Sequence, residues 1–99
     1  MVAEVPERLS RDMGCTVADL QRWMPGAANG QPIRWQSNGC EIGLGTGQVA
    51  LAWTPLPPRR IALLRIERLQ LDMVFSGCSA AIRSSFLAHF DAYTRRGGG

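Results

Sequence analysis

Every second residue is apolar over residues 40–44 and again over residues 49–53, on either side of the turn Gly45-Thr46-Gly47. Alternation at period two places apolar side chains on one face of a strand, and short glycine-containing loops join antiparallel strands. The sequence therefore predicts a β-hairpin here. Gly43, Gly45 and Gly47 also resemble the spacing of a phosphate loop. Such a loop requires a following helix N-terminus, whereas a strand follows here, so a turn is favoured.

A short amphipathic helix is predicted over residues 16–24. Thr16 is a candidate N-cap, and Asp19 three residues later completes a weak capping box. The apolar residues return to one face, with Trp23 as the expected core anchor. The Pro-Gly pair at 25–26 is expected to end the helix.

The clearest helix is predicted over residues 79–96, with Ser79 as N-cap and Gly97 as C-terminal cap. Its apolar stripe recurs at spacings of three and four residues and comprises Ile82, Phe86, Leu87, Phe90 and Tyr93. Residues 97–99 are expected to form a flexible tail.

The apolar pattern of residues 59–75 changes phase near Glu67. Leu64 and Ile66 share one phase, and Leu69 begins the other. A β-bulge near Glu67 would return both sets to the core, so one long bent strand or two nearly continuous strands are predicted. A helix over 59–68 stays open, because Ala, Leu, Arg and Glu are good helix formers.

The stretch TPLPPRR at residues 54–60 has two interpretations. The favoured one is a stiff connector between two strands, since proline restricts the unfolded chain. The alternative is a peptide-type recognition motif, P-x-x-P-x-R, formed by Pro55, Pro58 and Arg60.

Together these elements predict an α+β fold for a single domain spanning residues 1–99. A short N-terminal helix precedes a three- to four-stranded antiparallel meander sheet, and a long C-terminal helix packs across one face. Residues 1–15 are expected to be an irregular arm, and residues 32–36 a brief edge strand. With 45% hydrophobic residues, 99 residues suffice for one core but not for two.

No apolar run is long enough to span a bilayer, and the N-terminus lacks the pattern of a signal peptide. We therefore expect a cytoplasmic protein with no membrane partner. The chain contains eleven arginines and no lysine, a composition typical of GC-rich bacterial genomes. Cys15, Cys40 and Cys78 lack the close spacing of metal sites, and a redox role for Cys78 near a helix N-terminus stays open.

The sequence offers no convincing catalytic set, and no catalytic, cofactor or metal residue is assigned. His89 and Asp91 are two positions apart on a helix and should point away from each other. Glu41, Glu67 and Asp72 are too few for a metal site. A small enzyme without a recognisable motif is therefore only the third hypothesis.

The positive charge concentrates in residues 59–68 and at the C-terminus. Arg59, Arg60, Arg65 and Arg68 are a candidate partner or phosphate-binding surface, although Glu67 interrupts them. An uncovered sheet face is expected to carry a mixed surface of small and apolar residues: Ala50, Ala52, Leu63 and Val74. The leading hypothesis is a noncatalytic protein-interaction module that binds another protein or a second copy of itself. The alternative is an arginine-dependent nucleic-acid-binding protein.

Overall fold

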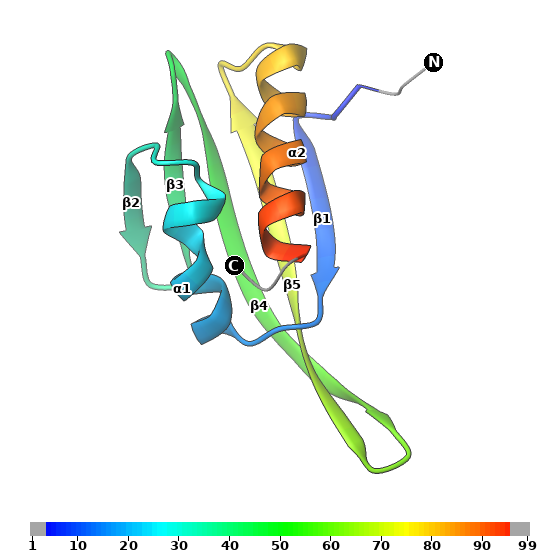
Figure 1. The fold of residues 1–99 in the computed structure, drawn as a ribbon. Coiled ribbons are helices and arrows are strands. Elements are labelled where there is room, and N and C mark those ends of the chain that lie inside the picture. The colour runs from blue at the N-terminus through cyan, green and yellow to red at the C-terminus, as the bar shows by residue number, and fades with distance from the viewer. Residues whose placement is uncertain (1–3, 96–99) are drawn as a thin grey trace.

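The computed structural model describes residues 4–95, so the expected tail at 97–99 lies outside the described residues. In chain order the elements are β1 (Arg8–Met13), α1 (Val17–Ala27), β2 (Ile33–Gln36), β3 (Gly39–Leu44), β4 (Gly47–Ile61), β5 (Leu64–Ser76) and α2 (Ala80–Arg95). The strands form one antiparallel sheet in the order β1-β5-β4-β3-β2. Both helices lie on the same face of the sheet (Figure 1). The predicted α+β class is confirmed, and we call the uncovered face the open face.

The β3–β4 hairpin forms as the alternating pattern predicts. Leu44 pairs with Gly47, and Gly45 in the turn adopts a φ of +65°, a left-handed conformation that favours glycine. The brief edge strand is also present as β2, which pairs with β3 through the turn at residues 37–38.

The core lies between the sheet and the two helices. Phe86 and Phe90 of α2 are buried as expected, and Phe86 packs edge-to-face against Phe75 of β5 with ring centroids 5.8 Å apart. Trp23, the expected anchor of α1, is half-buried and packs against this core. The other large side chains that are fully buried come from the inward phase of the three central strands and from α1: Leu20, Met24, Cys40, Ile42, Val49, Leu51, Leu69, Leu71 and Met73.

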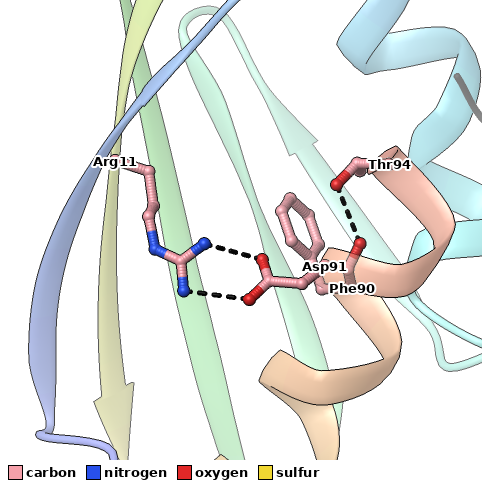
Figure 2. A network of polar contacts seen from close by, with 4 residues as sticks. All are labelled: Arg11, Phe90, Asp91 and Thr94. Carbon is pink, nitrogen blue, oxygen red and sulfur yellow. Dashed lines mark hydrogen bonds and ion pairs between the residues drawn. The ribbon is translucent and has the colours of Figure 1, made fainter. Parts of the chain in front are cut away.

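The sheet has five strands, because residues 8–13 form β1 instead of an irregular arm. β1 pairs with β5 from Arg8 opposite Val74 to Met13 opposite Leu69. The alternation of apolar and polar residues in β1 is hard to recognise in the sequence, because the charged Arg11 occupies a position that faces the core. Its guanidinium donates two hydrogen bonds to Asp91 of α2, at 2.8 and 2.9 Å, and so ties the edge strand to the helix (Figure 2).

Helix α1 begins as predicted but ends later. Thr16 and Asp19 form both hydrogen bonds of the capping box. The helix continues through Pro25 and Gly26 to Ala27, because a proline in the last turn removes only one intrahelical hydrogen bond. Gly26 also allows a close approach, since a Cβ placed there would lie 2.1 Å from the Tyr93 ring of α2.

The largest departure from expectation lies in residues 59–75. The chain turns back at Ala62-Leu63, so residues 59–61 end β4 and Leu64 begins β5; a helix does not form. The bulge lies on β4, where Pro57 and Pro58 stand opposite Glu67, and not on β5 at Glu67 itself. Pro57 and Pro58 lack the backbone N–H that regular pairing needs, which explains the register shift at this point.

Candidate functional site

The ends of β4 and β5 leave the sheet as a two-stranded ribbon, residues 54–68. Pairing of β3 with β4 ends at Gly39 opposite Ala52, and pairing of β1 with β5 ends at Met13 opposite Leu69. Beyond these points the two strands pair only with each other. Figure 1 shows this ribbon, in green to yellow-green, projecting away from both helices.

The expected connector at residues 54–60 is therefore one strand of the ribbon. Pro55 lies opposite Leu69, and Pro58 lies in the bulge. A polyproline ligand docks with an extended, unpaired backbone. The motif formed by Pro55, Pro58 and Arg60 is instead built into the β4–β5 pairing, so these three residues are not displayed as a separate segment.

The ribbon has two different faces. Cross-strand partners in an antiparallel pair point to the same side, and successive residues alternate. Ile61 lies opposite Leu64 on one face, which continues the open face of the sheet. Arg60 lies opposite Arg65 on the other. Next to its turn, the ribbon therefore has one apolar face and one charged face.

The tip of the ribbon exposes a group of aliphatic side chains. The exposed fractions are 51% for Ile61, 66% for Leu64 and 37% for Ile66, and Leu63 in the turn is fully exposed. Leu64 and Ile66 were expected in the core. They remain outside it because no bulge interrupts β5, so its regular alternation places both side chains on the open face, which neither helix covers. A cluster of exposed aliphatic residues on a projecting element is typical of an interaction site.

The four arginines of the ribbon do not form one stripe. Arg68 lies opposite Leu56 and Arg59 opposite Ile66, on the apolar face, whereas Arg60 and Arg65 share the other face. The predicted grouping of Arg65 with Arg68 depended on a bulge near Glu67. Because the bulge lies on β4, the two arginines point to opposite sides.

These arginines also differ in their partners. Arg68 pairs with Asp12 of β1, and Arg65 pairs with Glu67 at 3.0 Å. The hydrogen bond from Arg68, with added positive charge from Arg59, lowers the pKa of Asp12. Within residues 4–95 no carboxylate forms an ion pair with Arg59 or Arg60. Two positive charges next to the tip therefore lack an ion-pair partner in the described part of the chain, although Arg59 also attracts Asp12 at longer range.

The other titratable candidates take part in separate contacts. His89 Nε2 lies 2.9 Å from the Gly26 carbonyl, while Asp91 binds Arg11. Among the three acidic candidates, Glu67 pairs with Arg65 on the ribbon. Glu41 contacts Arg34, Gln36 and Gln48, and Asp72 accepts hydrogen bonds from Ser10 and Gln70. Over the described ranges, no three His, Cys, Asp or Glu side chains converge to hold a metal ion.

The cysteines are separated in the fold. Cys15 and Cys40 are buried, and burial raises the pKa of each thiol to about 11. Cys78 is half-buried two residues before α2, and its Sγ lies 3.6 Å from the Gln48 carbonyl oxygen. The structure brings no second thiol to Cys78 among residues 4–95.

Two hollows of about 250 Å³ flank the helices. One lies between β1 and α2 and includes Arg11 and Asp91, which already bind each other. The other lies where α1 ends and includes His89, whose ring nitrogen contacts the Gly26 carbonyl. Ser85 and His89 both line the second hollow, but among the described residues no hydrogen bond joins their side chains. The ribbon is therefore the stronger candidate site.

Comparisons of this chain with protein-family models, with curated proteins and with solved structures find no match. Over residues 4–95, neither helix has both the length and the apolar character needed to cross a membrane. Function is therefore inferred from the geometry and chemistry of the ribbon. The sequence could have indicated this site through the adjacent prolines, because two neighbouring residues without N–H groups mark a break in strand pairing.

Proposed function

We propose that this protein is a noncatalytic interaction module and that the ribbon is the element that contacts its partner. The observation that supports this proposal is the ribbon tip, where Leu63 is fully exposed and Ile61 and Leu64 are each more than half exposed. Full burial of one large aliphatic side chain contributes about 1.5–3 kcal/mol. The fold does not gain this burial free energy at Ile61, Leu63 or Leu64, because all three side chains remain exposed.

The body of the protein has no structural need for the ribbon. Its core is closed by the two helices and by the inner halves of β4 and β5, and no ribbon residue belongs to the buried set. An isolated two-stranded ribbon is at best marginally stable in water. A partner that covers the tip would stabilise it.

Nucleic acid is the second candidate partner, and Arg59 and Arg60 are the observation that favours it. Each phosphate contact contributes roughly 0.7–0.9 to the slope of log affinity against log salt. With Arg65 and Arg68 held by carboxylates, a slope near two is the most these residues support. We expect no measurable binding to duplex or single-stranded DNA at physiological ionic strength. Tight, strongly salt-dependent binding that is lost in the Arg59→Ala/Arg60→Ala variant would favour this candidate instead.

The proposal is tested by shortening the ribbon. Leu56 and Arg68 are cross-strand partners, so residues 57–67 can be replaced by a two-residue Asn-Gly turn without moving the rest of the sheet. The shortened chain should melt within a few degrees of the full chain. Unfolding of the shortened chain would mean that the ribbon is a structural part of the domain.

A photo-crosslinking amino acid at position 63 then reports what the tip contacts in living cells. We expect adducts at position 63 that are absent when the same group replaces Gln21, an exposed residue on α1. Equal labelling at the two positions would contradict a specific role for the tip.

A further inference from the structure

The partner of the ribbon has to fit a convex apolar tip. Leu63 projects fully into solvent from a two-residue turn, with Ile61 and Leu64 on either side. A convex tip is buried only by a concave site or by a medium that deforms around it. This shape limits the partners that could cover all of these side chains.

A second copy of the chain fits poorly. Two tips packed together would bury on the order of a few hundred Å² each, whereas stable interfaces bury about 1,200–2,000 Å² in total. Pairing would also bring two sets of ribbon arginines together. Arg60 already lies opposite Arg65 within one ribbon, and like charges in this position repel each other.

A nucleic acid would satisfy the charge but not the apolar residues. Phosphates attract arginine, but they offer nothing to exposed leucine and isoleucine side chains. The described ribbon has no aromatic side chain on which a base could stack. The partner should therefore be both anionic and able to take up aliphatic groups.

The spacing of charge and apolar surface matches a bilayer. Arg60 is two residues from the turn residue Ala62, and Arg65 is two residues from Leu63. At about 3.3 Å per residue these arginines lie roughly 7 Å from the end of the ribbon. Interfacial segments bury their apolar face about 5–10 Å into the boundary of headgroups and acyl chains. The guanidinium groups would then lie at the level of the lipid phosphates.

We propose that the ribbon binds the surface of an anionic phospholipid bilayer, with Ile61, Leu63 and Leu64 inserted at the headgroup–acyl boundary. Arg59 and Arg60 lie on the two faces of the ribbon beside this wedge and contact lipid phosphates, while Arg65 stays paired with Glu67. This inference rests on the proposed role of the ribbon and names its partner. It replaces the expectation of no membrane partner, which considered only segments long enough to span a bilayer.

The test is co-sedimentation of the full chain with vesicles of phosphatidylglycerol and phosphatidylcholine in equal parts, and with vesicles of phosphatidylcholine alone. We expect binding to the mixed vesicles that weakens as salt is raised, and at least tenfold weaker binding to the neutral ones. Equal binding to the two kinds of vesicle would contradict a contribution of the arginines to binding. No binding to the mixed vesicles at low salt would overturn the inference.

Two pairs of variants separate the apolar and electrostatic contributions. Leu63→Ser should weaken binding to the mixed vesicles about tenfold, whereas Ile82→Ser, at another exposed aliphatic residue on α2, should not.

Arg59→Gln/Arg60→Gln should weaken binding to the mixed vesicles on the order of fivefold per arginine. Arg22→Gln/Arg34→Gln removes the same charge from exposed positions outside the ribbon and is the matched control. Equal losses in a variant and its control would overturn the inference.

The crosslinking experiment distinguishes failure of this inference from failure of the proposed function. Lipid adducts at position 63 support the bilayer. Protein adducts or nuclease-sensitive adducts, without vesicle binding, overturn the bilayer but leave an interaction module. Neither adducts nor vesicle binding would overturn both.

Discussion

The inner and outer halves of β4 and β5 belong to the same two strands but have opposite environments. Leu69 and Leu71 in the inner half of β5 face the helices and are buried, whereas Leu64 in the outer half lies on the open face and is exposed. The inner halves have β1 and β3 as neighbours and helices across one face. The outer halves have only each other. Apolar character therefore indicates a core position only where another element covers the strand.

If the ribbon binds a partner as proposed, this division separates stability from recognition. Substitutions in the body should change the free energy of unfolding, whereas those at the ribbon tip should change binding and leave folding nearly intact. The predictions below test this separation, from the largest expected effect to the smallest.

Phe90→Ala should destabilise the protein by about 3–5 kcal/mol, because it opens a cavity beneath α2. Leu63→Ala removes a fully exposed side chain and should stay within about 0.5 kcal/mol. Urea unfolding followed by circular dichroism measures both. A loss at position 63 comparable to that at position 90 would remove the distinction between body and ribbon.

Gly26→Ala should destabilise by about 1–2 kcal/mol, because the added methyl group overlaps the ring of Tyr93 and forces it to move. The better helix propensity of alanine offsets part of this cost. Gly14→Ala, at the base of the ribbon, is the control, since its Cβ would meet Ile66 at an ordinary distance of 3.8 Å. Thermal melts that shift equally for both variants would contradict close packing between α1 and α2.

Arg11→Gln should cost about 0.5–1 kcal/mol, because it breaks a two-bond ion pair that is partly exposed to solvent. Arg60→Gln should stabilise slightly, because it removes the repulsion between Arg60 and the opposite Arg65. The comparison is made by chemical denaturation at low salt. A double-mutant cycle with Asp91→Asn isolates the contribution of the pair, and a coupling energy of zero would mean that it does not tie β1 to α2.

Pro57→Ala and Pro58→Ala should each destabilise by about 0.4–1 kcal/mol, mainly by freeing the unfolded chain. Differential scanning calorimetry of the two variants measures this. A loss above about 2 kcal/mol from either change would show that the ribbon folds as part of the core.

The parts of the fold with local signals were predictable. The β3–β4 hairpin has glycines in its turn, and α2 has a helical apolar stripe and begins directly after Ser79. β1 was missed because Arg11 occupies an inward position and depends on Asp91, which is 80 residues away in the chain. No local pattern reports such a contact.

The candidate site was predictable in composition but not in arrangement. The arginines and Leu63 were singled out by charge and apolar character. Their grouping depended on where the chain turns, and the turn uses Ala62 at a φ of +54°, a conformation that alanine rarely adopts. Without glycine or asparagine there, the sequence carried no turn signal, and the position of the bulge was assigned to the wrong strand.

The two prolines in the bulge have a further consequence for the chain in a crowded solution. A ribbon with two unpaired edges and an aliphatic tip is a template for strand addition by other copies, the route by which sheets grow into aggregates. Pro57 and Pro58 cannot donate backbone hydrogen bonds, and the bulge interrupts the straight run of the β4 edge. The arginines add charge repulsion between copies. The ribbon can therefore stay exposed to solvent, because its sequence resists polymerisation.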